Sequence, residues 1–551
     1  MAVSLYSERY PAIGESHGLS AIAGSLRGAF AEAELQVTLV DMVEWGEENA
    51  SRLAQAISEI QPDVLAIGLQ YGTFSFLQKH YALLRAAVRR PDALIVVGGP
   101  LATYLSDRLI DEVAAEAVVI LGEADEALPE LVRAWMHGLS DWSGVAGLRY
   151  RDRVHGVDIA TPRRLVDLRA VPPPSRLHLD RIAELGGEIF VETSRGCSWA
   201  SCTFCLRGLT DVQGRGFEFR RKSAEAVAQD LNELAVRGIR DVTIADEDFL
   251  GGDLDQTEDF VYQLLAMPLP TFRFDASATI HSVFSRRDTA DAAARRRALV
   301  EALAGAGLQK VFLGIESCSP AQLKRYAKGH TRSEAVAAAE LLRSLGVRVE
   351  IGVILFDPLC TLDEIEDSLQ FMRQHNLASV ASGISSELRL QTSSHYLTLL
   401  EKYERAQGVV LHDPAFDPDT LMHSYRFADR EVQRLYDSVQ LWNRRLHPLY
   451  YPSKSLSRFG TAGALGESVQ ELRTATNLFR DQTCDAILAA IRHGRAGNDF
   501  RAAFDLDIEA TARHLADAVV RALAHRDGPD AHPVIGRALV AARNVDTLLT
   551  A

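Results

Sequence analysis

The sequence predicts an α/β protein in three parts: an N-terminal doubly wound sheet, a central partial (β/α)6 barrel and a mostly helical C-terminal region. Short apolar runs alternate with amphipathic stretches up to about residue 140, and the same alternation returns in residues 186–400. Beyond residue 400 the pattern is mostly helical. At 551 residues the chain exceeds one ordinary core, and about three domains are expected.

Composition limits the class of protein. The chain is 47% hydrophobic and 24% charged, which is typical of a globular protein. With 59 Lys and Arg against 74 Asp and Glu, the net charge is −15, which disfavours nonspecific binding to nucleic acid or anionic membranes. Six cysteines, half of them in one loop, indicate a reducing compartment. The N-terminus does not read as a signal peptide and no apolar run reaches the ~20 residues of a membrane span, so we expect a cytoplasmic protein without a membrane partner.

The N-terminal domain is expected to cover residues 1–140. Apolar runs that begin at Val37, Val64, Leu94 and Val118 predict strands, and residues 77–89 and 124–136 predict helices between them. Strands that alternate with helices form a parallel sheet covered on both faces. Such a sheet binds ligands at the carboxyl ends of its strands.

Three of these strand ends are rich in glycine, which lets the backbone approach a large flat ligand. One continues as Leu-Gln-Tyr-Gly-Thr after residue 68, the next as Gly-Gly-Pro after residue 97, and the third as Gly-Glu-Ala-Asp after residue 121. Together and in this order they resemble the cobalamin-binding domain that precedes many radical S-adenosylmethionine (SAM) barrels. The resemblance implies that cobalamin contacts Gln70, Tyr71, Gly72, Thr73, Gly98, Gly99, Pro100, Thr103, Gly122 and Glu123.

The lower face of the cobalt is expected to have no histidine ligand. Many cobalamin proteins carry Asp-x-His-x-x-Gly, whose His ligates cobalt, and this motif does not occur in residues 1–140. His17 lacks both the Asp and the spacing. Gln70 or Tyr71 is expected there instead, while a packed loop aromatic is the alternative for Tyr71.

Residues 141–185 read as a connector. Residues 147–150 and 154–158 predict a small hairpin, and the run Val171-Pro-Pro-Pro-Ser175 is stiff and extended, as at a domain boundary.

Three cysteines, Cys197, Cys202 and Cys205, lie within nine residues, in a loop that follows a short strand at 189–192. Three thiolates can hold three irons of a [4Fe–4S] cluster and leave the fourth iron open to a substrate or cofactor. A structural zinc site, the main alternative, needs four ligands, and no second Cys or Cys/His pair follows at finger spacing. The loop resembles the cluster loop of the radical SAM enzymes, in which SAM binds the open iron. Here four residues separate the first two cysteines, where the family usually has three.

The central domain, residues 186–400, is expected to place its chemistry at the carboxyl ends of the barrel strands. The strands are predicted at residues 189–192, 241–245, 272–276, 310–315, 347–354 and 384–390. Acidic residues follow the second strand, Gly-Ile-Glu-Ser ends the fourth, and the apolar fifth runs into Phe356-Asp357-Pro358.

These strand ends resemble radical SAM motifs at corresponding places. The resemblance implies that carboxylates after strand two meet the SAM ammonium, that Glu316 or Ser317 binds the ribose, and that strand five packs the adenine. Residues 220–223 resemble an Arg-x-Lys-Ser motif that holds a carboxylate. The SAM contacts implied are Phe204, Arg221, Asp246, Glu247, Glu316, Ser317 and Ile354.

Two alternatives stay open for the acidic run: its side chains face solvent, or one of them binds the open iron and displaces SAM. The sequence also departs from the family. Phe356-Asp357-Pro358 replaces a Gly-Leu-Pro run, and Cys318 stands where the family usually has Gly. Cys318 and Cys360 are expected to be fortuitous, with binding of substrate or metal as the alternative.

The resemblance implies a cobalamin-dependent radical SAM C-methyltransferase (class B) that methylates an unactivated carbon of a small-molecule or natural-product substrate, free or carrier-bound. It implies a [4Fe–4S] cluster, SAM, cobalamin as methylcobalamin, and an external electron donor such as flavodoxin or ferredoxin. One alternative is rearrangement, cyclisation or ring contraction without methyl transfer; another is a non-enzymatic cobalamin or redox sensor. No catalytic residue is singled out. Residues 401–551, with helices predicted at 429–445, 467–478 and 508–524, are expected to help define the substrate.

Overall fold

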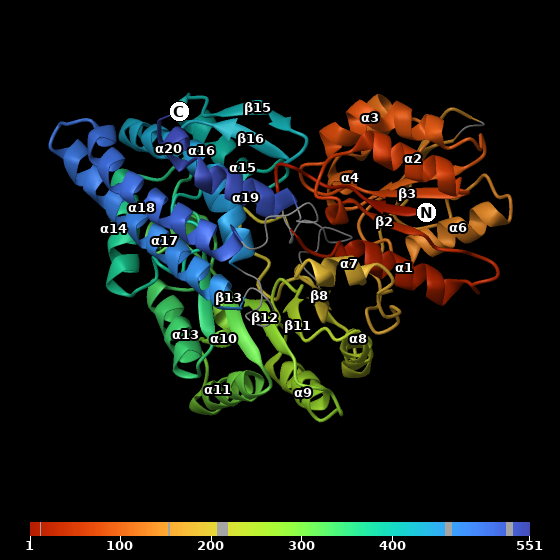
Figure 1. Ribbon diagram of the computed structural model, residues 1–551, viewed down its shortest axis with the longest axis horizontal. Helices are drawn as coiled ribbons and strands as arrows, with labels where there is room; N and C mark the ends of the chain where they lie inside the picture. The colour runs from red at the N-terminus through yellow and green to blue at the C-terminus, as the bar shows by residue number, and fades with distance from the viewer. Residues whose placement is uncertain (12, 153–154, 207–218, 458–465, 525–532, 551) are drawn as a thin grey trace.

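The computed structural model describes residues 1–11, 13–152, 155–206, 219–457, 466–524 and 533–550 (Figure 1). It has the predicted order of parts: an N-terminal α/β domain, a central parallel sheet with helices, and a C-terminal group of helices. In Figure 1 the N-terminal domain and the C-terminal helices lie on opposite sides of the molecule, and the barrel strands lie between and below them.

The N-terminal sheet has seven strands in the order β2-β1-β3-β4-β5-β6-β7. The first five run parallel, and β6 and β7 are antiparallel. Their bounds are β1 (Ala2–Ser4), β2 (Leu39–Asp41), β3 (Val64–Gly68), β4 (Leu94–Gly98), β5 (Val118–Ile120), β6 (Leu148–Arg151) and β7 (Asp158–Ala160). The central strands are continuous Val, Leu and Ile runs because a parallel sheet is buried on both faces.

Two pairs of helices cover this sheet. One face packs against α1 (His17–Ala29) and α6 (Ala127–Met136), and the other against α2 (Ala50–Ile60) and α3 (Phe74–Ala87). A hairpin is present in the connector as β6 and β7, and it extends this sheet, but its second strand lies at Asp158–Ala160 and not at the predicted residues 154–158. Val154, where its second strand was predicted to begin, lies outside the described residues.

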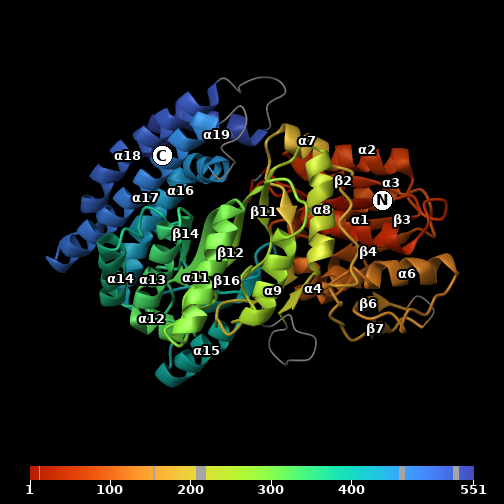
Figure 2. The same cartoon turned by 90° about the horizontal axis from the view of Figure 1, so that it is seen from below.

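The central sheet has five parallel strands in the order β14-β13-β12-β11-β8. Their bounds are β8 (Phe190–Val191), β11 (Asp241–Ile244), β12 (Arg273–Ala278), β13 (Leu308–Glu316) and β14 (Arg348–Val353). The sixth predicted strand, at residues 384–390, is replaced by isolated bridges, Ile351 with Ala381 and Phe356 with Glu387, which hold the chain beside β14. The longer helices of this domain are α8 (Ala224–Val236), α9 (Leu254–Leu265), α11 (Ala290–Gly305), α13 (Arg332–Ser344) and α14 (Leu362–Gln374), and the short α10 (Ile280–Val283) and α12 (Pro320–Arg325) lie between them. Figure 2 shows α8, α9 and α11 on the outer side of the strands.

The C-terminal part shares one hydrophobic core with the barrel. It contains α15 (His395–Gln407), α16 (Arg430–Leu456), α17 (Gly466–Arg495), α18 (Phe500–Leu523), α19 (Pro533–Arg543) and α20 (Val545–Thr550). Within the ranges described above, no helix combines the length and the apolar character needed to cross a bilayer.

A hairpin within this part was not predicted. It consists of β15 (His412–Asp417) and β16 (Met422–Tyr425), and its tip reaches the N-terminal domain. The Gly72 amide donates to the carbonyl of Asp419 at 2.7 Å, and Leu421 is buried in the N-terminal core. Two segments almost 350 residues apart in the chain thus meet beside the end of β3.

Candidate functional site

The cysteine loop leaves β8 and is fixed through Thr203, which lies between Cys202 and Phe204. The Thr203 amide donates to the carbonyl of Tyr326 at 3.1 Å, and its hydroxyl donates to the carbonyl of Arg325 at 2.9 Å. The Thr203 carbonyl accepts from the amide of Tyr396 at 2.7 Å. Both backbone polar groups and the side chain of this residue are therefore held by distant parts of the chain.

Trp199 fixes the other side of the loop. Its indole nitrogen donates to the carbonyl of Ala327 at 2.9 Å, and its ring lies 4.5 Å from that of His281. A Cβ on Gly329 would come within 2.2 Å of the Trp199 ring, and the φ of Gly329 is +71°. Gly329, which follows Lys328 after the fourth barrel strand, thus helps to position the cysteine loop, because only glycine leaves room for the Trp199 indole.

The three thiols of the loop are partly exposed, and none of the six cysteines, all of which the structure describes, is in a disulfide. Burial raises the pKa of Cys202 to about 11, while the nearby Lys328 ammonium lowers it. Among the described residues no group of three or more His, Cys, Asp or Glu is arranged around one metal ion. The thiolates of a [4Fe–4S] cluster each bind a different iron, and three thiols in one loop fit that donor set.

The other three cysteines are buried. Cys318 and Cys360 are 1% and 0% exposed, and burial raises the pKa of Cys318 to about 12. Cys360 accepts from the amide of Asp357, and Cys484 is buried against α14. They act as small core residues.

Glu316 ends β13 and lies over two glycines of the barrel. Its carboxylate oxygens come within about 3.2 Å of where a Cβ on Gly314 or Gly352 would stand, so side chains at those positions would displace it. Glu316 has a φ of +68°, a rare conformation for a residue with a side chain. In the described part of the chain its cationic partner is Lys328, at 3.9 Å. Burial raises the pKa of Glu316, and Lys328 opposes that shift.

Ile354 and Phe204, predicted to contact SAM, belong to one apolar cluster with Tyr326, at the junction of β14 and the cysteine loop. The Phe204 ring meets Tyr326 edge-on at 5.5 Å, and Lys328 lies 5.9 Å from its centroid. The structure therefore brings Phe204 and Ile354 together with Lys328, which is also the ion-pair partner of Glu316.

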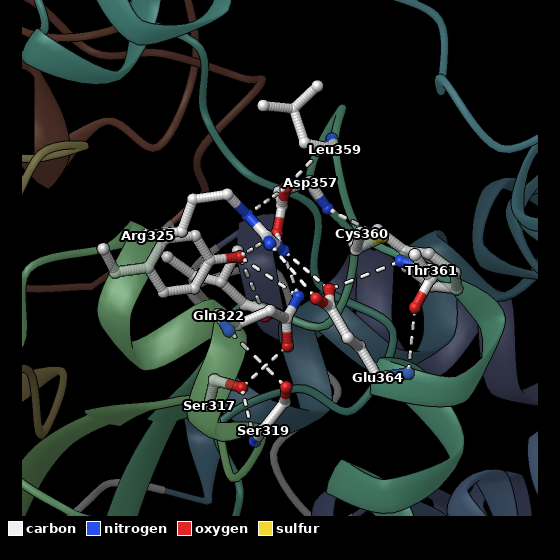
Figure 3. A network of polar contacts seen from close by, with 12 residues as sticks. Ser317, Ser319, Gln322, Arg325, Asp357, Leu359, Cys360, Thr361 and Glu364 are labelled. Carbon is white, nitrogen blue, oxygen red and sulfur yellow. Dashed lines mark hydrogen bonds and ion pairs between the residues drawn. The ribbon is translucent and has the colours of Figure 1, made fainter.

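Ser317, the alternative ribose contact, points elsewhere. It is 1% exposed, its hydroxyl donates to Gln322 at 2.7 Å, and its oxygen accepts from the Ser319 amide at 2.9 Å. Figure 3 shows Ser317 and Ser319 beside Gln322. In this arrangement Glu316 is the better placed of the two for a ligand.

The three acidic residues after β11, Asp246, Glu247 and Asp248, differ in burial and in their hydrogen-bond partners. Asp246 is 3% exposed and accepts from Thr193 and Ser194, with three contacts of 2.5–2.8 Å. Asp248 is fully buried and accepts from neighbouring hydroxyls, including that of Ser198 at 2.5 Å. Both therefore brace the cysteine loop, and Glu247, which is half-buried, remains the predicted ammonium contact.

Arg221 also turns toward protein groups. One of its terminal nitrogens donates to the carbonyls of Phe249 and Gly251, at 3.0 and 2.9 Å. The guanidinium lies 4.7 Å from the centroid of Phe260, and burial lowers its pKa. Its other terminal nitrogen is buried with no hydrogen-bond partner among the described residues, so a carboxylate acceptor at that nitrogen stays a prediction.

The glycine-rich strand ends lie at one edge of the N-terminal sheet. Gly98 and Gly99 are half-buried and Gly122 is exposed. A Cβ on Gly99, at φ +98°, would come within 2.5 Å of the Leu69 carbonyl. Thr103 joins two of the loops, because its hydroxyl lies 3.3 Å from the Gly99 carbonyl and accepts from the Gly122 amide at 2.9 Å. Pro100 begins α4 (Pro100–Tyr104) and is exposed.

The residues after β3 contact other protein groups. Gln70 donates to Ser4 at 2.8 Å, and Thr73 closes a turn back to the Gln70 carbonyl. Tyr71 accepts from Gln391 at 3.3 Å. Gly72 has a φ of +86°, and a Cβ there would overlap Ser7. A role for this segment at the lower face of cobalt stays a prediction.

Partly buried ion pairs join the two α/β domains. Asp125, after β5, pairs with Arg195 at 2.7 Å, and Arg195 also pairs with Glu192 at the base of the cysteine loop. Glu123, predicted to bind cobalamin, pairs with Arg220 at 2.6 Å. Arg195 and Arg220 belong to the short antiparallel strands β9 (Ser194–Arg195) and β10 (Arg220–Arg221), where the sequence predicted only loop. The third glycine-rich loop is therefore fastened to the stem of the cysteine loop, which no spacing in the sequence indicates.

Comparison with protein families identifies two domains. Residues 5–132 match the B12 binding domain, and residues 191–372 match the radical SAM superfamily. The two matches coincide with the sheet that carries the glycine-rich loops and with the barrel that carries the three cysteines.

Individual relatives share this organisation at low identity. A 4'-phospho-dehydrooxetanocin synthase from Priestia megaterium is 24% identical over 80% of this chain and 65% of its own length. The chain thus spans slightly less than two thirds of that relative.

Two solved structures share the fold. The cobalamin-dependent SAM radical enzyme OxsB, with aqua-cobalamin bound, matches with a TM-score of 0.77 and 19% identity, covering 98% of this chain and 84% of its own. The radical SAM methyltransferase TsrM from Kitasatospora setae, with cobalamin and a [4Fe–4S] cluster bound, matches with a TM-score of 0.62 and 16% identity, covering 90% and 99%. The chain is therefore a member of the radical SAM superfamily that carries a B12-binding domain, the combination found in cobalamin-dependent radical SAM enzymes.

Proposed function

We propose that this enzyme is a C-methyltransferase that acts on a small-molecule carbon. The observation that carries the proposal is the pairing of the Gly122 loop with the stem of the cysteine loop, through Glu123–Arg220 and Asp125–Arg195. A corrin at the glycine-rich loops and SAM at the cysteine loop would then share one cleft. The name of TsrM supports methyl transfer, as do those of relatives called hopanoid C-3 methylase and cytidylyl-2-hydroxyethylphosphonate methyltransferase.

The residues of this chain have distinct parts in the proposal. When bound, the cluster, SAM and cobalamin supply a radical that removes hydrogen from the substrate carbon and a methyl group that replaces it. Cys197, Cys202 and Cys205 hold the cluster, Glu316 accepts hydrogen bonds from the SAM ribose, and Ile354 forms the wall beside the adenine. Apolar packing around this wall excludes water, which strengthens the hydrogen bonds to Glu316.

A second candidate function is rearrangement without methyl transfer. Its support is the synthase from Priestia megaterium, whose name mentions no methyl transfer. It matches 80% of this chain, against 62% for the hopanoid methylase and 60% for the phosphonate methyltransferase. A non-enzymatic sensor is the weaker alternative because it needs no carboxylate at the Glu316 position. An external reductant, such as a flavodoxin or ferredoxin, is proposed with either enzyme.

Incubation with SAM, reductant and a candidate substrate tests these functions. Methyl transfer predicts S-adenosylhomocysteine, 5'-deoxyadenosine and a methylated product. Rearrangement predicts 5'-deoxyadenosine and an isomeric or contracted product without S-adenosylhomocysteine. A sensor predicts no SAM cleavage, and that result would remove both enzymatic functions.

The cluster assignment is tested by replacing all three loop cysteines with alanine. Anaerobically prepared wild-type protein should hold four irons and cleave SAM, while the triple variant should lose both. Cys484→Ala is the matched control because that thiol is buried away from the loop. Four irons in the triple variant would refute the assignment.

A further inference from the structure

A buried carboxylate with an unusual number of donors lies behind the SAM-binding end of the barrel. Asp357 is 0% exposed. It accepts from Tyr396 at 2.5 Å, Tyr326 at 2.8 Å, Gln322 at 3.0 Å and two nitrogens of Arg325 at 2.9 and 3.2 Å. Figure 3 shows Arg325 between this carboxylate and Glu364. Asp357 belongs to the run Phe356-Asp357-Pro358 after the fifth strand, where the resembling family has an apolar residue, and it is not among the predicted SAM contacts.

Three of the residues that donate to Asp357 also hold the cysteine loop. The side chains of Arg325, Tyr326 and Tyr396 end on the Asp357 carboxylate, and their backbones bind all three polar groups of Thr203. The position of Thr203, between two cluster cysteines, is thus fixed by residues that are themselves fixed by Asp357.

The same carboxylate is tied to the other two SAM-binding strand ends. Through Gln322 it reaches Ser317, which adjoins Glu316 at the end of β13. Asp357 itself follows β14 three residues after Ile354, and the rings of Tyr326 and Tyr396 pack in the apolar cluster that contains Ile354 and Phe204. Three elements that must each present a SAM contact therefore converge on one side chain.

The chemistry of the network favours one fixed geometry. A carboxylate has about four acceptor sites, and the five hydrogen bonds above, with a sixth from the Leu359 amide at 3.0 Å, occupy all of them. Burial raises the pKa of both phenols well above the usual range, so both stay protonated and donate. A fully satisfied buried network of this kind specifies one arrangement of the groups that it joins.

We infer that Asp357 is a positioning residue for SAM: it sets the cysteine loop, the Glu316 strand end and the Ile354 wall at the spacing that SAM needs to reach the open iron. This inference rests on the SAM site of the proposed function. It does not depend on whether the enzyme transfers a methyl group or catalyses a rearrangement. It predicts that loss of one hydrogen bond to Asp357 lowers the affinity for SAM while the [4Fe–4S] cluster is retained.

The test is Tyr396→Phe, which removes one donor to Asp357 and keeps the ring packing. The matched control is Tyr436→Phe, which removes a phenol–carboxylate bond between α16 and Glu387; neither residue bonds to Thr203 in the described part of the chain. Iron content, the thermal midpoint and the SAM-dependent change in the electron paramagnetic resonance (EPR) spectrum of the reduced cluster are measured for each. Both variants should keep four irons and similar midpoints, while the SAM concentration for half-maximal change should rise about tenfold in Tyr396→Phe alone.

Two results would overturn the inference: an unchanged SAM requirement in Tyr396→Phe, or an equal rise in both variants, which would reduce the network to a general structural role. Asp357→Asn is expected to show a larger rise than Tyr396→Phe; Tyr396→Phe decides the question even where the Asp357 variant fails to fold. Absence of any SAM response in the wild-type protein would overturn the SAM site and the proposed function together. If the wild-type protein responds to SAM and Tyr396→Phe needs the same SAM concentration for its response, the inference is overturned and the proposed function is not.

Discussion

At the scale of single residues, we expect Glu316 to bind SAM. Its carboxylate is largely buried, is offset by one lysine at 3.9 Å and lies over two glycines that leave it room. Loss of a buried, charge-assisted hydrogen bond costs roughly 1.5–3 kcal/mol, about ten- to hundredfold in affinity. Glu316→Ala should therefore weaken SAM binding by that factor in equilibrium dialysis, with iron and cobalamin contents unchanged. Unchanged affinity would mean that Ser317 makes the contact, and lost cobalamin would mean that the two cofactor sites are wrongly divided between the domains.

The ionisation of Glu316 gives this site a pH dependence. Burial raises its pKa above the ordinary value of 4.5, and only the ionised form accepts with a full charge. As the pH falls, SAM affinity should begin to weaken at a higher pH than an exposed glutamate would give. Glu316→Gln, which cannot titrate, should show weaker binding with a flat profile over the same range. Parallel profiles in the two proteins would assign the titration to another group.

His17 is the residue to examine for the prediction that no histidine ligates the cobalt. It is 14% exposed at the start of α1, 3.8 Å from Glu15, and both ring nitrogens are buried without a hydrogen-bond partner in the described residues. We expect bound cob(II)alamin to show no nitrogen superhyperfine splitting from an axial base in its EPR spectrum, and His17→Ala to leave the spectrum unchanged. A nitrogen triplet that disappears in His17→Ala would make this histidine the ligand.

At the scale of elements, the cysteine loop depends on a glycine more than 120 residues away. Gly329→Ala combines an unfavourable φ of +71° with a Cβ that overlaps Trp199. Gly346→Ala is the matched control, because Gly346 has a φ of +76° and nothing within 4 Å of the added atom. In both variants the free energy of unfolding should fall by about 1–2 kcal/mol, because alanine disfavours the left-handed backbone conformation. Only Gly329→Ala should also lose iron, measured per chain after anaerobic reconstitution; equal iron contents would show that Trp199 can move without harm to the cluster.

At the scale of the whole molecule, the domain interface is expected to hold cobalamin. The Asp125 and Arg195 side chains are 6% and 17% exposed, so removal of one partner leaves a poorly solvated charge. Asp125→Asn should speed the loss of bound cobalamin by about tenfold or more in gel filtration, a cost of about 1.4 kcal/mol, and leave the iron content intact. Asp111→Asn is the control, since its pair with Arg151 is exposed and lies within the N-terminal domain. Equal retention in both variants would place the corrin away from this interface.

Much of this organisation was predictable from local sequence. Strand and helix periods gave the two α/β domains, because apolar patterning is set residue by residue. The cysteine loop was recognisable because all three thiols lie in one short segment, and the glycine-rich loops because each follows a strand. Of the six predicted barrel strands, the sixth was wrong, since pairing beside β14 is limited to isolated bridges that no local pattern reveals.

The tertiary structure decided which polar groups are available to ligands. Asp246 and Ser317 match family motifs by spacing, yet their hydrogen-bonding capacity is directed to Thr193 and Gln322. The hydrogen bonds to Asp357 and the Asp125–Arg195 pair join residues tens of positions apart, whose proximity follows only from how the chain packs. Sequence by itself determined the fold class and the cofactor chemistry because these depend on residue type and short spacing. The structure determined the geometry of the site because desolvation and hydrogen-bond satisfaction depend on long-range contacts.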